Sequence, residues 1–107
     1  MTDSTILEEY ADFVEDMVVT YGRERLAENT LGLCGEAGEV AEKIKKFFRD
    51  NTLDDDAIQK ELGDVIFYWF ALNNALGFNP LNTIRHNMMK LESRKERGVL
   101  QGSGDTR

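Results

Sequence analysis

The chain has 107 residues, which suits a single folded domain, and its 41% hydrophobic and 31% charged residues are typical of a globular protein. Its net charge of −7 argues against a nucleic-acid polymer as partner, because nonspecific binding of that kind needs a basic surface. The same charge admits a small polyanion whose contact with the protein a metal ion mediates. A single cysteine excludes an intrachain disulfide, and the longest weakly charged run is interrupted by asparagine, glycine and proline, which argues against a membrane span. Together with a polar N-terminus, these features favour a reduced, cytoplasmic compartment.

Apolar residues recur at spacings of three and four along most of the chain, and this periodicity predicts an all-α protein with four helices. Three aspartates suit the N-terminus of the third helix, and the one proline suits the first turn of the fourth. Residues 98–107 are rich in glycine, so we expect an irregular tail in a single domain that covers residues 1–107. The helices are predicted at Ser4–Tyr21, Asn29–Phe48, Asp54–Leu76 and about Pro80–Arg97.

The third predicted helix is apolar around its whole circumference between Val65 and Leu72. A helix without a polar face is buried on all sides, and three other short helices of the same chain can hardly cover it. We therefore expect a four-helix bundle that oligomerisation completes, either as a symmetric dimer or as a tetramer. Phe67 and Phe70 are expected on the face that a second chain covers, because they point away from the acidic residues of this helix.

Two pairs of acidic residues lie three positions apart on consecutive helices, Glu36 with Glu39 and Glu61 with Asp64. Residues at this spacing share one helix face, and both pairs lie at the edge of an apolar stripe. Four carboxylates gathered where the helices meet would repel one another and lose part of their hydration. A divalent cation bound between them would offset both costs. Their oxygens suit Mg²⁺ or Mn²⁺, and Mg²⁺ commonly shares its ligand shell with phosphates. The alternative is that both pairs lie on solvated helix faces.

Three glycines interrupt the second helix around its acidic pair, although each costs about 0.5–1 kcal/mol relative to alanine in a helix interior. A residue without a side chain leaves room beside the helix. We therefore interpret Gly35 and Gly38 as positions where a neighbouring backbone or a ligand approaches closely.

The pattern Glu36-x-x-Glu39, twenty-one residues, then Glu61-x-x-Asp64 resembles the signature of the MazG-like all-α nucleoside triphosphate pyrophosphohydrolases. The stretches "GLCGEAGEVAEKIKK", "KELGDVIFYWFAL", "NNALGF" and "HNMMKLESRKERGVLQGSGDTR" also resemble family segments, in the family's order. The resemblance implies Mg²⁺-dependent cleavage of a (deoxy)nucleoside triphosphate between its α and β phosphates, and tetramers built from two dimers. It implies that the four carboxylates ligate one or two Mg²⁺ ions. Which glutamate acts instead as the base on the attacking water stays open.

Basic and amide side chains are candidates for binding the triphosphate. Asn87, Lys90 and Arg94 share one face of the last helix and match the family's Asn-x-x-Lys-x-x-x-Arg pattern, and such donors suit phosphate oxygens. Lys43 and Lys46 lie on the helix face of the glutamate that precedes them, where salt bridges are an equal alternative to phosphate contact.

Two aromatic residues follow the last acid of the motif. Tyr68 lies four residues after Asp64 and is therefore a candidate for lining the site, and Trp69 is a candidate for stacking on a base. The alternative for both is a place in the core. The tail ends in "GSGDTR", which differs at one position from the "GSGDNR" of close relatives, and the sequence assigns it no role.

Two alternative functions stay open at this point. The first is a different substrate within the same superfamily, phosphoribosyl-ATP or dUTP, with the same metal chemistry. The second is a non-enzymatic helical oligomerisation module whose acids are solvated and bind no divalent ion specifically. The sequence does not identify the preferred nucleobase or sugar.

Overall fold

The computed structural model describes residues 3–107, with side chains from residue 5 onward, and this part of the chain contains four helices and no strand. The prediction of an all-α protein is confirmed. None of the described helices is both long and apolar enough to cross a membrane. The helices are α1 (Asp3–Met17), α2 (Gly22–Asp50), α3 (Asp55–Ala75) and α4 (Pro80–Glu96), and residues 98–107 follow without regular structure.

The boundary between α1 and α2 lies earlier than the sequence predicts. α1 ends at Met17 instead of Tyr21, and α2 already begins at Gly22 instead of Asn29. The residues 18–20 are β-branched, which disfavours a helix, and Gly22 has a φ of 63° that glycine adopts easily. The first turns of α2 consist mostly of exposed residues. They lack an apolar stripe, so periodicity could not detect them.

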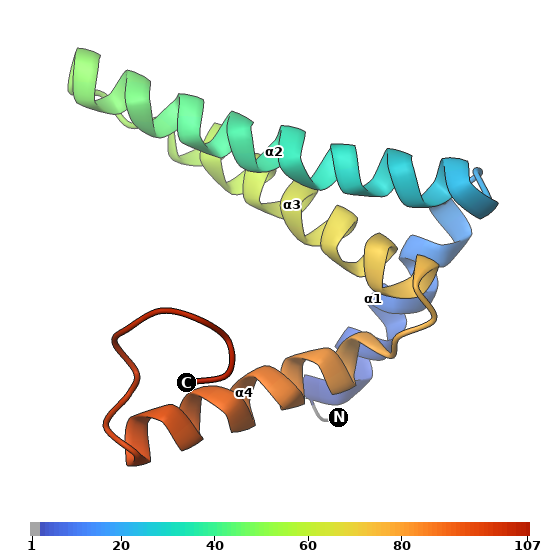
Figure 1. The fold of residues 1–107 in the computed structure, drawn as a ribbon. Helices are drawn as coiled ribbons and strands as arrows, with labels where there is room; N and C mark the ends of the chain where they lie inside the picture. The colour runs from blue at the N-terminus through green and yellow to red at the C-terminus, as the bar shows by residue number, and fades with distance from the viewer. Residues whose placement is uncertain (1–2) are drawn as a thin grey trace.

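A short turn connects α2 to α3. The N–H of Asn51, which has a left-handed φ of 55°, donates to the carbonyl of Phe47 at 2.7 Å and closes α2. The side chain of Asp54 then accepts from the N–H of Ala57 at 3.1 Å and caps α3. Because the turn is short, α2 and α3 run antiparallel and pack against each other along their lengths (Figure 1).

The other two helices pack at the C-terminal end of α3. The amide of Asn74 donates to the carbonyl of Ala11 on α1 at 3.1 Å, and the hydroxyl of Thr83 on α4 donates to the side-chain oxygen of Asn73 at 2.6 Å. Within the described residues α4 contacts α1 and α3, but not α2. The chain is therefore an open V, with the α2–α3 hairpin as one arm and α4 as the other (Figure 1). Completion of a closed bundle by a second chain stays a prediction.

The core is small and lies between α1 and α3. Val14, Phe70 and Ala71 are fully buried, and Tyr10 packs edge-on against Phe70 with ring centres 5.0 Å apart. The expectation that Phe70 faces a second chain is wrong, because α1 of the same chain covers it. Phe67 also packs, partly buried, against this core. Helical periodicity shows which residues share a face, but not which helix meets that face.

Many large apolar side chains outside this core are exposed. On α3 they include Leu62 and Ile66, and on α2 they include Ile44 and Phe48, which is 80% exposed. Monomeric proteins seldom expose so much large apolar surface. Leu62 and Ile66 belong to the part of this surface that lies on the hairpin, and further exposed apolar residues, such as Phe13 on α1 and Met89 on α4, lie outside it.

Candidate metal and phosphate site

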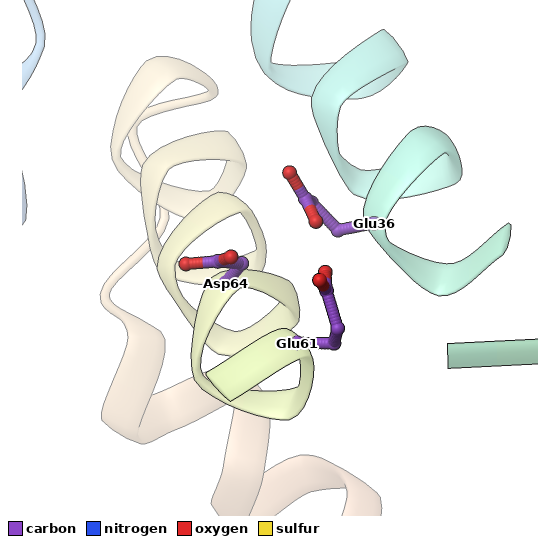
Figure 2. A group of neighbouring side chains, drawn as sticks. All are labelled: Glu36, Glu61 and Asp64. Carbon is purple, nitrogen blue, oxygen red and sulfur yellow. The ribbon is translucent and has the colours of Figure 1, made fainter. Parts of the chain in front are cut away.

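Three carboxylates meet where α2 faces α3. Glu36 comes from α2, and Glu61 and Asp64 come from α3 (Figure 2). One oxygen of each carboxylate lies within 4.8 Å of the others. The antiparallel hairpin creates this proximity, because it places the middle of α2 opposite the first half of α3. Three of the four carboxylates that the sequence singles out are thus brought together.

The three carboxylates of the cluster lie close enough together to affect the pKa of Glu36. A hydrogen bond with Glu61 raises the pKa of Glu36, and partial burial and the negative charges of Asp64, Glu61 and Glu39 raise it further. A carboxyl group with a raised pKa holds its proton more tightly than usual, because the negative charges around it disfavour its ionised form. A divalent cation at this position would offset the repulsion among these carboxylates.

The donor set of the cluster fits a hard divalent ion. Three carboxylate oxygens from two helices are the ligand type that Mg²⁺ and Mn²⁺ prefer, and the exposure of Asp64 leaves the cluster open to water and to a ligand. Mg²⁺ usually retains several waters and binds through one or two carboxylates plus phosphate oxygens. The open side of the cluster leaves room for such waters and phosphate oxygens, and the three carboxylates can share one or two ions.

Glu39 lies beside the cluster without belonging to it. Its side chain is exposed, and its oxygens are not among those grouped within 4.8 Å. Its charge nevertheless contributes to the raised pKa of Glu36, which is one helical turn away. The role of Glu39 as a fourth ligand stays a prediction.

The predicted phosphate-binding residues of α4 lie on the other arm of the V. Asn87 and Lys90 are exposed, whereas Arg94 is only 4% exposed. In the described residues α4 does not contact α2, and it meets α3 near Asn73, at the opposite end of α3 from Glu61, so a single chain does not bring these side chains onto the carboxylate cluster. Lys90 and Arg94 instead both contact Asp105 of the C-terminal segment, at 3.4 and 3.3 Å.

The comparison with known proteins identifies the family. Residues 24–99 match the family model of the MazG nucleotide pyrophosphohydrolase domain, which is more than half of the chain and includes all four candidate carboxylates. The chain belongs to the MazG nucleotide pyrophosphohydrolase family. It is also 48% identical over 89 residues to "Gene 37 protein" of Mycobacterium phage L5, and this match covers 78% of each chain. No solved structure gave a significant match.

The two lysines that follow the acids on α2 make no ion pair with them. Lys43 is partly buried and Lys46 is exposed, and neither lies within salt-bridge distance of a carboxylate in the described part of this MazG chain. The ion pair of this stretch joins Lys45 to Glu42 at 3.7 Å. Salt bridging therefore does not occupy Lys43 or Lys46, and their contact with phosphate stays a prediction.

The close approach on α2 occurs at a different glycine from those that the sequence suggests. A Cβ atom at Gly32 would lie 2.4–2.6 Å from ring atoms of Tyr68, whereas at Gly35 or Gly38 it would meet nothing within 4 Å. No backbone in the described part of this chain approaches Gly35 or Gly38, and approach by a ligand or by a second chain stays a prediction. Tyr68 lies partly buried on the bare backbone of Gly32, one turn before Glu36.

Tyr10 on α1 is a site neighbour that sequence reasoning missed. Burial raises the pKa of its phenol, and the negative charge of Asp64 raises it further, so the two groups lie close enough to interact. Tyr10 lies outside the residues matched by the MazG model. Its position in an ordinary apolar repeat gave no signal that it would lie near the acids.

Proposed function

We propose that this MazG chain is a Mg²⁺-dependent nucleoside triphosphate pyrophosphohydrolase, which cleaves a (deoxy)nucleoside triphosphate between the α and β phosphates to the monophosphate and pyrophosphate. The observation that carries the proposal is the cluster of Glu36, Glu61 and Asp64 within 4.8 Å of one another. Membership of the family supports the reaction class. Mn²⁺ is expected to replace Mg²⁺, because it takes the same oxygen ligands.

The carboxylates have distinct tasks in this reaction. Glu36, Glu61 and Asp64 would hold the ion, which when bound lowers the pKa of a coordinated water and neutralises triphosphate charge. Glu39 stands next to them and is assigned to the site as a fourth ligand or as the base that takes the proton of the water. Experiment can distinguish the two roles of Glu39. Removing a metal ligand weakens the affinity for the metal, whereas removing the base lowers kcat at saturating metal.

Phosphate and nucleoside contacts are assigned to the remaining candidates. Lys43, Lys46 and Tyr68 lie on the hairpin that carries the acids, and Asn87, Lys90 and Arg94 lie on α4. A triphosphate that touches both groups requires the two arms to come together or a second copy to supply its α4. The exposed apolar surface of the hairpin supports assembly into a dimer or tetramer.

The test is pyrophosphate release from a panel of nucleoside triphosphates during a Mg²⁺ titration. Asp64→Asn and Glu39→Gln should abolish release, whereas Glu28→Gln, which removes an exposed carboxylate of α2, should leave it unchanged. Including dUTP and phosphoribosyl-ATP in the panel decides between substrates of the superfamily. Activity within tenfold of the unmodified protein in both site variants would refute the carboxylate assignment, and a protein that binds no divalent ion would be an oligomerisation module.

A further inference from the structure

The C-terminal segment, residues 98–107, forms a defined loop that folds back over α4 (Figure 1). The guanidinium of Arg107 donates to the carbonyls of Val99 at 3.0 Å, of Leu100 at 2.9 Å and of Gly104. Arg97, just after α4, donates in turn to the backbone carbonyl of Arg107 at 2.9 Å. Arg107 therefore closes the loop on itself and fastens it to the end of α4.

Asp105 in this loop forms ion pairs with Lys90 and Arg94 of α4. Its carboxylate is 3.4 Å from Nζ of Lys90 and 3.3 Å from Nη2 of Arg94, and the same Nη2 donates to the backbone carbonyl of Asp105 at 2.8 Å. The guanidinium of Arg94 and the ammonium of Lys90 lower the pKa of Asp105, so its carboxylate is ionised at neutral pH. The loop covers Arg94 almost completely and leaves the Lys90 side chain 40% exposed.

The ion pair between Asp105 and Lys90 lies at the end of a surface groove. A groove of about 540 Å³ runs along α4 from Phe78 to Lys90, and the amides of Asn79, Asn82 and Asn87 line it. Lys90 is the one lysine or arginine among its lining residues. A ligand that enters with its anionic end toward Lys90 therefore meets a carboxylate that already contacts this ammonium.

We propose that the C-terminal loop is an autoinhibitory latch, in which Asp105 occupies the phosphate-binding position of Lys90 and Arg94 and a triphosphate must displace it. The inference rests on the proposed function, which assigns these two cations to phosphate binding. Carboxylate and phosphate oxygens are alternative acceptors for the same donors, and a triphosphate offers more charge than one carboxylate. Lys90 is accessible and takes the first contact, whereas Arg94 becomes available only after the loop leaves.

The first experiment measures KM for the triphosphate in Asp105→Asn. The amide keeps the size of the side chain but removes the competing charge, so KM should fall about two- to fivefold, the range that an exposed ion pair supports, while kcat stays the same. Glu92→Gln is the matched control, because it removes one exposed carboxylate from α4 and should leave KM unchanged. A rise in KM would overturn the latch, since Asp105 would then hold the cations in place for the substrate. An unchanged KM would overturn it as well.

The second experiment needs no catalysis and therefore separates the latch from the proposed function. Inorganic tripolyphosphate without metal should speed tryptic cleavage after Arg97, followed by mass spectrometry as loss of residues 98–107. Lys90→Gln should abolish this acceleration, whereas Glu92→Gln should preserve it. Tripolyphosphate that leaves the cleavage rate of the unmodified protein unchanged would overturn the latch. Failure of pyrophosphate release with an intact tripolyphosphate effect would instead refute the proposed reaction alone.

Discussion

Alanine at Gly32 should make the protein less stable than alanine at Gly35, although both glycines lie in the interior of α2. A Cβ atom at Gly32 would lie 2.4–2.6 Å from three ring atoms of Tyr68, far inside van der Waals contact. At Gly35 the same atom would meet nothing of this chain within 4 Å, so Gly35→Ala is the matched control. The comparison isolates the contact between Tyr68 and the helix backbone.

The expected difference follows from two opposing effects. Alanine stabilises a helix interior by about 0.5–1 kcal/mol over glycine, and both variants receive this benefit. In Gly32→Ala the partly buried ring of Tyr68 must also move away from its edge-on contact with Phe67, where the ring centres are 5.3 Å apart. Overpacking of this kind typically costs about 1–3 kcal/mol. The free energies of unfolding of the two variants should therefore differ by about 1–3 kcal/mol.

Urea denaturation followed by circular dichroism measures this difference, at one protein concentration because assembly would make the midpoint concentration-dependent. The substitution Tyr68→Ala supplies an internal check. In that background the clash is absent, so Gly32→Ala should stabilise the protein as much as Gly35→Ala does. Equal midpoints for the two alanine variants in the unmodified background would show that the ring does not lie on Gly32.

Two further predictions concern charge and assembly. Because the pKa of Glu36 is raised in the folded state, the metal-free protein binds a proton more tightly than the unfolded chain does, so its melting temperature should rise as pH falls from neutrality through that pKa. At lower pH the stability should fall again as Asp50 and Asp105, whose pKa values are lowered, become protonated. A melting temperature that only falls as the pH is lowered from neutrality would contradict the raised pKa of Glu36. The double substitution Leu62→Asp with Ile66→Asp should give species of lower mass than the unmodified protein in light scattering. An unmodified protein that is monomeric and stable at micromolar concentration would refute the expected assembly into a dimer or tetramer.

The sequence predicted the four helices, and it singled out the three carboxylates that the structure brings together, because both depend on regular spacing. A period of 3.6 residues marks an apolar stripe, and an interval of three places Glu61 and Asp64 on one face. The start of α2 was missed because its first turns carry no apolar stripe. The side of α3 that α1 covers was also missed, since a helix apolar all round has no pattern that orients Phe70.

Contacts between polar residues that lie far apart in the sequence could not be predicted from the spacing of residue types. Asp105 meets Lys90 across fifteen positions, and this depends on how Arg107 closes the C-terminal loop. Tyr10 likewise comes near Asp64 only because α1 packs across α3. The family match extends from residue 24 to 99, so it covers neither Tyr10 nor Asp105. These two contacts required the three-dimensional structure.

The arrangement of glycines and acids on α2 now has a two-part explanation. Gly32 is required inside the chain, because any side chain there would collide with Tyr68. Gly35 and Gly38 have no such requirement in this chain, and alanine at each would stabilise the helix by about 0.5–1 kcal/mol. They lie on either side of Glu36, whose pKa is raised by a hydrogen bond with Glu61, by burial and by the negative charges of its acidic neighbours. An open backbone and an uncompensated negative cluster at the same turn of α2 both favour a binding partner from outside the chain, which is what a metal–triphosphate complex would provide.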